Sequence, residues 1–153
     1  MSFRMAWGDQ ISDPPSTTQL YPIGEVRKDI TSGKIYRYFK ATATLASNQA
    51  VRSDYTDSTG AGVVPVDSIT RDFAGVAEQA FVSGQWGWFA QSGILSTKSL
   101  SAVVAGDLLA PSATSGCFGP ASTVVTNQHV CGVALSNGVA NNGAIPVRVF
   151  GVL

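Results

Sequence analysis

The chain offers few side chains that could carry out acid–base or nucleophilic chemistry. His129 is its only histidine, and no carboxylate lies within ten residues of it. A Ser-His-Asp or Cys-His arrangement would have to use this residue. Catalytic zinc sites usually need more than one histidine. We therefore interpret His129 as a surface or strand-end side chain, and we expect that the protein is not an enzyme.

Paired carboxylates are the other possible route to catalysis. Asp54 and Asp57 lie in one polar stretch, and Asp67 and Asp72 flank another short segment. A glycosidase needs two carboxylates brought together, and these positions leave that arrangement open. Acids scattered over loops are more commonly solvated charges or turn caps, which is the interpretation we favour. Asp54 and Asp57 also lack the ligand density of a calcium-binding EF-hand loop.

Three aromatic residues gather in one short run, at Trp86, Trp88 and Phe89. Flat rings can stack on sugars or on bases. Nucleic-acid binding would need basic neighbours, and the nearest are Arg71 and Lys98. We predict that the three rings pack in the core or at a subunit interface, and carbohydrate binding stays open as an alternative.

Composition narrows the classes of partner. Charged residues make up 13% of the 153 residues, and the formal net charge is zero. An average globular protein has about 25% charged residues, so this surface suits a protein covered by neighbours. The charge balance predicts no direct nucleic-acid partner and no anionic membrane partner. No apolar run approaches the ~20 residues of a membrane helix.

The cysteines and the N-terminus indicate the compartment. Cys117 and Cys131 fit buried free thiols in a reducing compartment, with a disulfide as the less favoured alternative. Their spacing matches no zinc pattern, and we expect neither a metal nor another cofactor. The N-terminus has no signal-peptide core, and Asp9 would interrupt one, so we expect a protein made and used without export.

Sixteen glycines, seven prolines and many short β-rich runs predict an all-β fold. The expected body is a small β-sandwich or barrel of short strands and hairpins, with at most one or two short helices. Ile35–Leu45 predicts one long strand, and Ile145–Leu153 predicts a strong closing strand. Val63–Val66 contains a proline and therefore predicts an edge strand.

The body contains a faint internal repeat. Ala74–Ala77 reads Ala-Gly-Val-Ala, and Cys131–Ala134 reads Cys-Gly-Val-Ala. Each is followed by a glycine-containing turn and then by an apolar strand that ends near a further glycine, Gly93 or Gly151. Both copies predict a strand, a turn and a strand. Repeated sheet units without a polar constellation are typical of a building block rather than an enzyme.

The first twenty residues differ from the rest. Asp13–Thr18 contains two prolines, which prevents a helix and disfavours a central strand. We predict an extended N-terminal arm over residues 1–20 and a single β-rich domain over residues 21–153. The large apolar residues of the arm are poor choices for a solvated tail, although a frayed terminus is the alternative; they are Phe3, Met5, Trp7 and Ile11.

From about Pro22 to Leu153 the layout of short glycine-based motifs resembles the decoration, or cement, proteins of tailed-bacteriophage heads. The motifs that carry the resemblance are Gly33–Ala41, Ser47–Val51, Gly75–Ala77, Gly84–Phe89, Val104–Leu109 and Gly132–Ala134. The resemblance implies a β-rich homotrimer on the outer surface of an icosahedral capsid, assembled in the host cytoplasm. It implies that the trimer bridges subunits of the major capsid protein and stabilises the shell, and it brings no catalytic residues.

In such proteins a terminal arm often reaches over the shell, so Phe3, Met5, Trp7 and Ile11 become candidate capsid-binding residues. Strand addition to a capsid edge is one mode for the arm. Three alternatives remain open: a tail, baseplate or fibre component of a virion, a carbohydrate-binding module that uses Trp86 and Trp88, and an enzyme on a barrel scaffold.

Overall fold

A computed structural model of the chain describes residues 11, 13–67, 72–121, 130–140 and 142–151. The fold is all-β, as predicted, and no α-helix occurs within those ranges. The strands are β1 (Val26–Lys28), β2 (Ile35–Ala41), β3 (Gln49–Ser53), β4 (Gly62–Pro65), β5 (Gly75–Ala77), β6 (Trp86–Ser99), β7 (Leu108–Pro111), β8 (Phe118–Pro120), β9 (Gly132–Ala134) and β10 (Gly143–Phe150).

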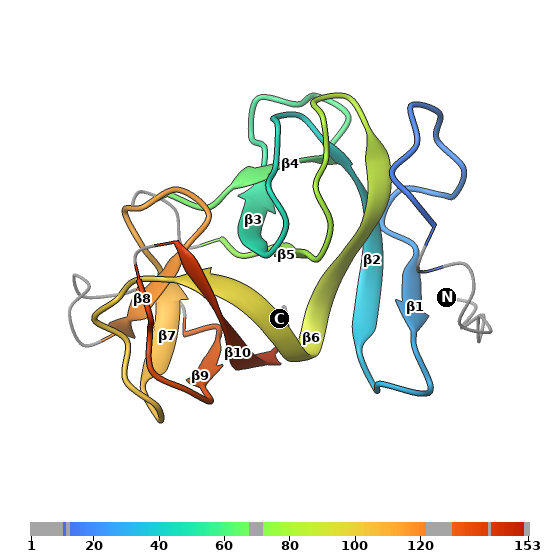
Figure 1. Cartoon of the computed structure of the whole chain (residues 1–153). Helices are drawn as coiled ribbons and strands as arrows, with labels where there is room; N and C mark the ends of the chain where they lie inside the picture. The colour runs from blue at the N-terminus through green and yellow to red at the C-terminus, as the bar shows by residue number, and fades with distance from the viewer. Residues whose placement is uncertain (1–10, 12, 68–71, 122–129, 141, 152–153) are drawn as a thin grey trace.

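The strands form one sheet that closes twice. Their order is β1-β2-β4-β3-β5-β6-β10-β9-β7-β8, with additional pairings between β2 and β6 and between β6 and β8. The first closure makes a ring of β2, β4, β3, β5 and β6, which we call barrel 1. The second makes a ring of β6, β10, β9, β7 and β8, which we call barrel 2. Figure 1 shows barrel 2 at the lower left and barrel 1 above and to its right.

The two barrels share β6, which is 14 residues long. Its first part pairs with β2 in barrel 1, where Phe89 lies opposite Arg37. Its second part pairs with β10 in barrel 2, where Leu95 lies opposite Val147. The strand curves from one barrel into the other (Figure 1). Closing both ends of the sheet reduces the unpaired strand edges that promote aggregation.

Barrel 2 repeats the connectivity of barrel 1 strand by strand. In barrel 1, β2 pairs in parallel with β4, β4 pairs with β3, β3 with β5, and β5 with β6. In barrel 2, β6 pairs in parallel with β8, β8 pairs with β7, β7 with β9, and β9 with β10. Each barrel is then closed by an antiparallel pairing, β2 with β6 and β6 with β10. The whole barrel is therefore duplicated, and the predicted repeat is the part of this duplication that can be recognised in the sequence.

The duplication extends to hydrogen bonds at equivalent turns. The Asn48 N–H donates to the Ala77 carbonyl at 2.6 Å, and the Gly106 N–H donates to the Ala134 carbonyl at 2.8 Å. Asn48 has φ of 66° and Gly106 has φ of 93°. Both turns thus require the left-handed backbone region that glycine and asparagine tolerate best. The same turn chemistry precedes the second strand of each barrel, β3 and β7.

The glycine of each Gly-Val-Ala strand is fixed by close approach of a neighbouring strand. A Cβ atom on Gly75 would lie 2.9 Å from the Ala90 carbonyl oxygen. A Cβ atom on Gly132 would lie 2.5 Å from the Arg148 carbonyl oxygen. Real carbon–oxygen contacts are longer, so a larger residue would displace β6 or β10. This contact explains why the repeat is recognisable at these glycines.

Separate sets of apolar side chains fill the barrels. The interior of barrel 1 holds Phe81 stacked on Phe89 at 4.7 Å between ring centroids, together with Ala41, Leu45, Val51, Val63, Ala74 and Ala77. Barrel 2 is lined by alternate residues of β10 and by its neighbours, including Leu95, Leu109, Phe118, Ile145, Val147 and Val149. Complete burial of one such side chain contributes about 1.5–3 kcal/mol.

Candidate functional site

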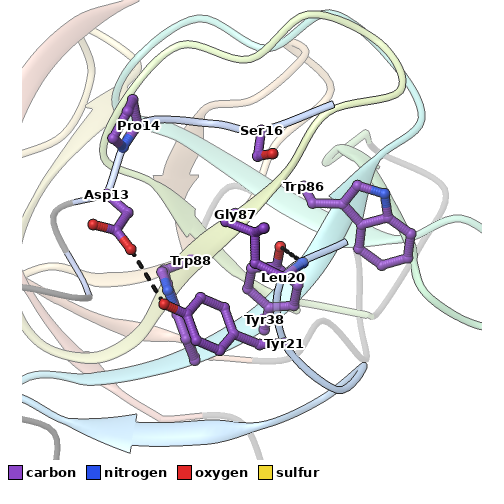
Figure 2. A pocket seen from close by; sticks show the side chains of 9 residues that line it. All are labelled: Asp13, Pro14, Ser16, Leu20, Tyr21, Tyr38, Trp86, Gly87 and Trp88. Carbon is purple, nitrogen blue, oxygen red and sulfur yellow. Dashed lines mark hydrogen bonds between the residues drawn. The ribbon is translucent and has the colours of Figure 1, made fainter. Parts of the chain in front are cut away.

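Residues 13–21 lie against the outer surface of barrel 1. The Ser16 N–H donates to the Trp86 carbonyl at 3.0 Å, and the Trp86 N–H donates to the Ser16 carbonyl at 2.7 Å. The Leu20 N–H donates to the Tyr38 hydroxyl at 3.1 Å, and the Tyr21 hydroxyl donates to Asp13 at 3.2 Å (Figure 2). These bonds hold the second half of the predicted arm on β2 and β6. We call this contact area the arm seat.

An aromatic cluster forms the floor of the arm seat. The Tyr21 ring lies 5.2 Å from both the Tyr38 and the Trp88 ring centroids. The Arg27 guanidinium lies 4.3 Å from the Tyr21 centroid and 4.6 Å from the Trp88 centroid. Arg27 also donates to Glu25 at 2.8 Å and 2.9 Å. Cation–π contact and ion pairing together compensate this buried charge.

The structure places each predicted aromatic residue. Phe89 is fully buried inside barrel 1 and Trp88 is 3% exposed beneath the arm seat. Trp86 is partly buried and stacks on Tyr38 at 5.9 Å between centroids. The rings of Trp86 and Trp88 are thus engaged by Tyr38, Tyr21 and Arg27. Trp88 therefore has no exposed face, and Tyr38 occupies one face of Trp86.

Of the four predicted capsid-binding residues, only Ile11 belongs to the part of the chain that the structure describes. Phe3, Met5 and Trp7 lie outside the described residues, so their role stays a prediction. Ile11 is 9% exposed and belongs to the larger apolar cluster of the body. The arm therefore contacts the body at Ile11, which packs in this cluster, and at Ser16, which bonds to Trp86 of β6. Any segment reaching beyond the body would be residues 1–10.

The carboxylates singled out from the sequence serve local structure. Asp54 accepts hydrogen bonds from Thr42 and Thr56, and these bonds lower the pKa of its carboxyl. The pKa of Asp57 is lowered by hydrogen bonds from Thr59. These are turn-capping arrangements of the kind predicted from loop position.

The second acidic pair is also engaged by its surroundings. Asp67 pairs with Arg52 at 2.9 Å, and Asp72 accepts a hydrogen bond from the Ser53 N–H at 3.1 Å. Both acids of this pair therefore have partners on β3.

Other sequence candidates can be placed only in part. Cys117 and Cys131 are buried thiols, and burial raises the pKa of both, that of Cys131 to about 12. His129 lies outside the described residues. Within the described ranges, no group of three or more histidine, cysteine or acidic side chains is arranged to hold a metal ion. Across the same ranges, no helix has the length and apolar character needed to cross a membrane.

The main surface feature missed by the sequence reasoning is an exposed row on barrel 2. The strand registers place Ile94 opposite Arg148, Arg148 opposite Val133, and Val133 opposite Leu108. These residues form one row across β6, β10, β9 and β7, which we call the open row. Ile94 is 54% exposed and Leu108 is 52% exposed. Phe150, at the end of β10, is 56% exposed on the same side of the strand as Arg148.

A sequence signal for the open row existed in the alternation of the closing strand. Ile145, Val147 and Val149 face inward, so Arg148 and Phe150 had to face outward. The partner residues on β7 and β9 could be found only once the strand order was known.

No protein-family model matches the chain, and no curated protein matches it. Among solved structures, the chain is similar to the crystal structure of the head fiber gp8.5 N base in bacteriophage phi29. The TM-score is 0.55 at 13% sequence identity, and the alignment covers 76% of this chain and 93% of that chain. At this identity the likeness establishes a shared fold.

Proposed function

We propose that the chain is a structural protein of a phage virion that binds the outer surface of the head. The observation that carries the proposal is the fold, because 93% of the phi29 head-fiber base aligns with this chain. The glycine-based motifs of the body resemble head decoration proteins, which supports the same location. The carboxylates Asp54 and Asp57 are engaged in turns, which gives no support to a catalytic role.

In this proposal the protein acts as a homotrimer that bridges subunits of the major capsid protein and stabilises the shell. Each copy presents the same contacts, so a modest affinity per contact becomes a high overall avidity. The apolar anchors are Phe3, Met5 and Trp7, which precede the arm seat. Ile11 is 9% exposed and packs in the larger apolar cluster of the body, so in this proposal it anchors the arm to the body rather than to the capsid.

The arm seat determines which deletion of the arm is suitable for testing head binding. Deletion of residues 1–20 would remove Ser16 from Trp86 and would uncover Trp88, so lost binding could reflect a damaged body. Deletion of residues 1–10 leaves these contacts intact. Binding to undecorated heads is then measured by co-sedimentation. Wild-type binding that is lost in the shorter deletion supports the arm mechanism, and unchanged binding removes the arm from it.

A second candidate is the base of a head fibre, favoured because the similar structure is the base of the phi29 head fiber. A fibre base and a decoration protein both bind the head, but only the fibre base carries a protruding fibre. Electron microscopy of virions with gold-labelled protein separates the two. Label at the foot of a protruding fibre supports the fibre base, and label spread over a smooth shell supports decoration. Label on the tail would contradict both.

A further inference from the structure

The internal duplication allows the surfaces of the two barrels to be compared position by position. In barrel 1, the strand registers place Tyr36 opposite Ala90, Ala90 opposite Val76, and Val76 opposite Ala50. These residues form a row across β2, β6, β5 and β3, which we call the covered row. It is the counterpart of the open row of barrel 2, because those four strands correspond to β6, β10, β9 and β7.

The covered row and the open row differ in exposure. Ala50, Val76 and Ala90 are each 0% exposed, and Tyr36 is 7% exposed. In the open row, Ile94 and Leu108 are more than half exposed. The covered row of barrel 1 is therefore buried in the folded chain. The equivalent open row of barrel 2 stays exposed, and it contains large apolar residues.

Barrel 2 itself helps to cover the row of barrel 1. Gly116, in the loop between β7 and β8, accepts a hydrogen bond from the Ala50 N–H at 2.9 Å and donates to the Val66 carbonyl at 3.0 Å. A Cβ atom on Gly116 would lie 2.7 Å from the Gln49 side chain, so the loop is tightly seated. The chain thus already contains one example of such a loop docked on such a row.

Barrel 1 carries the corresponding loop, between β3 and β4. The Thr56 N–H donates to the Asp54 side chain at 2.9 Å, as the Thr114 N–H donates to the Ser112 side chain at 3.2 Å in the β7–β8 loop. Gly60 has φ of 69° near the end of one loop, and Gly116 has φ of 74° near the end of the other. The β3–β4 loop is exposed over Tyr55, Thr56 and residues 58–60.

We propose that the open row is the docking surface for the β3–β4 loop of a second copy of this chain. Barrel 1 of the second copy then packs on barrel 2 of the first copy, in the same way that barrel 2 packs on barrel 1 within one chain. The charges are complementary, since Arg148 is exposed in the open row and the loop carries Asp54 and Asp57. The exposed Tyr55 ring supplies apolar surface for Ile94 and Leu108.

This contact is head to tail, so the two surfaces involved are different on each copy. Such an interface generates a closed ring when its rotation closes. The inference rests on the proposed function only for the number of copies in the ring. The docking surface itself is argued from the two barrels.

Charge insertion in the open row tests the proposal. The variants are Ile94→Glu and Leu108→Glu, and the matched control is Ile30→Glu, because Ile30 is 65% exposed and lies outside the row. Sedimentation equilibrium of the full chain measures self-association. We expect the row variants to weaken it at least about tenfold, as truncation of a central anchor does, and the control to leave it unchanged. An unchanged mass in both row variants, or a wild-type protein that stays monomeric, overturns the proposal.

Cross-linking tests the direction of the contact. Leu108→Cys protein mixed with Ser58→Cys protein should give a covalent pair under mild oxidation, whereas Leu108→Cys protein alone should not. Self-linking of the Leu108→Cys variant would overturn the head-to-tail arrangement in favour of a two-fold one. The chain lacking residues 1–10 should keep its self-association. Loss of self-association in this deletion variant would indicate that the arm, and not the β3–β4 loop, occupies the open row, and it would overturn the proposal.

Binding to undecorated heads separates this inference from the proposed function. Self-association that depends on Ile94 and Leu108, in a protein that never binds heads, supports the docking surface and contradicts the head location. If the protein binds heads and the row variants self-associate normally, the head location is supported and the docking surface is contradicted.

Discussion

The arm seat predicts a large effect from the substitution Tyr21→Ala. The Tyr21 ring makes two aromatic contacts at 5.2 Å and one cation–π contact at 4.3 Å. Aromatic pairs contribute about 0.5–1.5 kcal/mol each beyond area burial, and a cation–π contact contributes about 0.5–2 kcal/mol, the upper value when the cation is buried. The expected loss is therefore about 1.5–5 kcal/mol of unfolding free energy, or a fall of about 3–20 °C in Tm for a chain of this length.

Two further variants isolate the cause. Tyr21→Phe keeps the ring and removes only the hydrogen bond to Asp13, so it should cost about 0.5–1.5 kcal/mol. Ile30→Ala truncates a side chain that is 65% exposed, and it should stay within about 0.5 kcal/mol of the wild type. The free energies come from guanidinium titration followed by tryptophan fluorescence, since Trp88 lies next to Tyr21.

Limited proteolysis supplies the second readout for the same variants. Loss of the Tyr21 contacts should release residues 13–20 from β2 and β6, so cleavage in this segment should precede cleavage of the body. If Tyr21→Ala is as stable and as resistant as Ile30→Ala, the arm is not held by the aromatic cluster, and the reasoning is refuted.

The remaining predictions concern the duplicated barrel and its thiols. Gly132→Ala should destabilise the protein by about 1–3 kcal/mol, because the new Cβ would lie 2.5 Å from the Arg148 carbonyl oxygen. Val139→Ala, at a residue 77% exposed, is the control; equal stability of the two variants in thermal unfolding would contradict the close approach. At pH 8 the native protein should resist a thiol reagent, because burial raises the pKa of Cys117 and of Cys131, and two thiols should react once it is unfolded. Rapid reaction of either thiol in the native state would refute the burial.

The all-β class was predictable because alternation and glycine spacing are local properties. The Gly-Val-Ala repeat predicted two hairpin units, and these are β5–β6 and β9–β10. The full duplication was hidden because its remaining strands share connectivity and turn geometry rather than residue types. Asn48 and Gly106, for example, occupy the same turn with different side chains.

Two strand predictions were wrong in instructive ways. The strand predicted over Ile35–Leu45 ends at Ala41, because Leu45 instead forms an isolated bridge with Phe81 across barrel 1. Val63–Val66 was predicted as an edge strand, yet β4 lies between β2 and β3. Pro65 is tolerated there because β2 pairs only with Gly62 and Val63, so the missing N–H falls beyond that ladder.

The surfaces were the least predictable part of the molecule. Trp88 and Phe89 were expected to pack, and they are buried, but no local pattern in the sequence indicated that the Arg27 side chain covers Trp88. Its role depends on Tyr21, which reaches it through tertiary packing. The open row likewise joins four strands that are far apart in the sequence, and no local pattern places them side by side.

The most direct test of the account is cryo-electron microscopy of undecorated heads incubated with the full chain, from the virus that encodes it. The account predicts saturable density on the outer surface at threefold or quasi-threefold positions. Three copies of the tandem barrel should fit that density, with Leu108 of each copy facing the β3–β4 loop of the next. Heads that remain bare at saturating protein, or density confined to the tail, would contradict it.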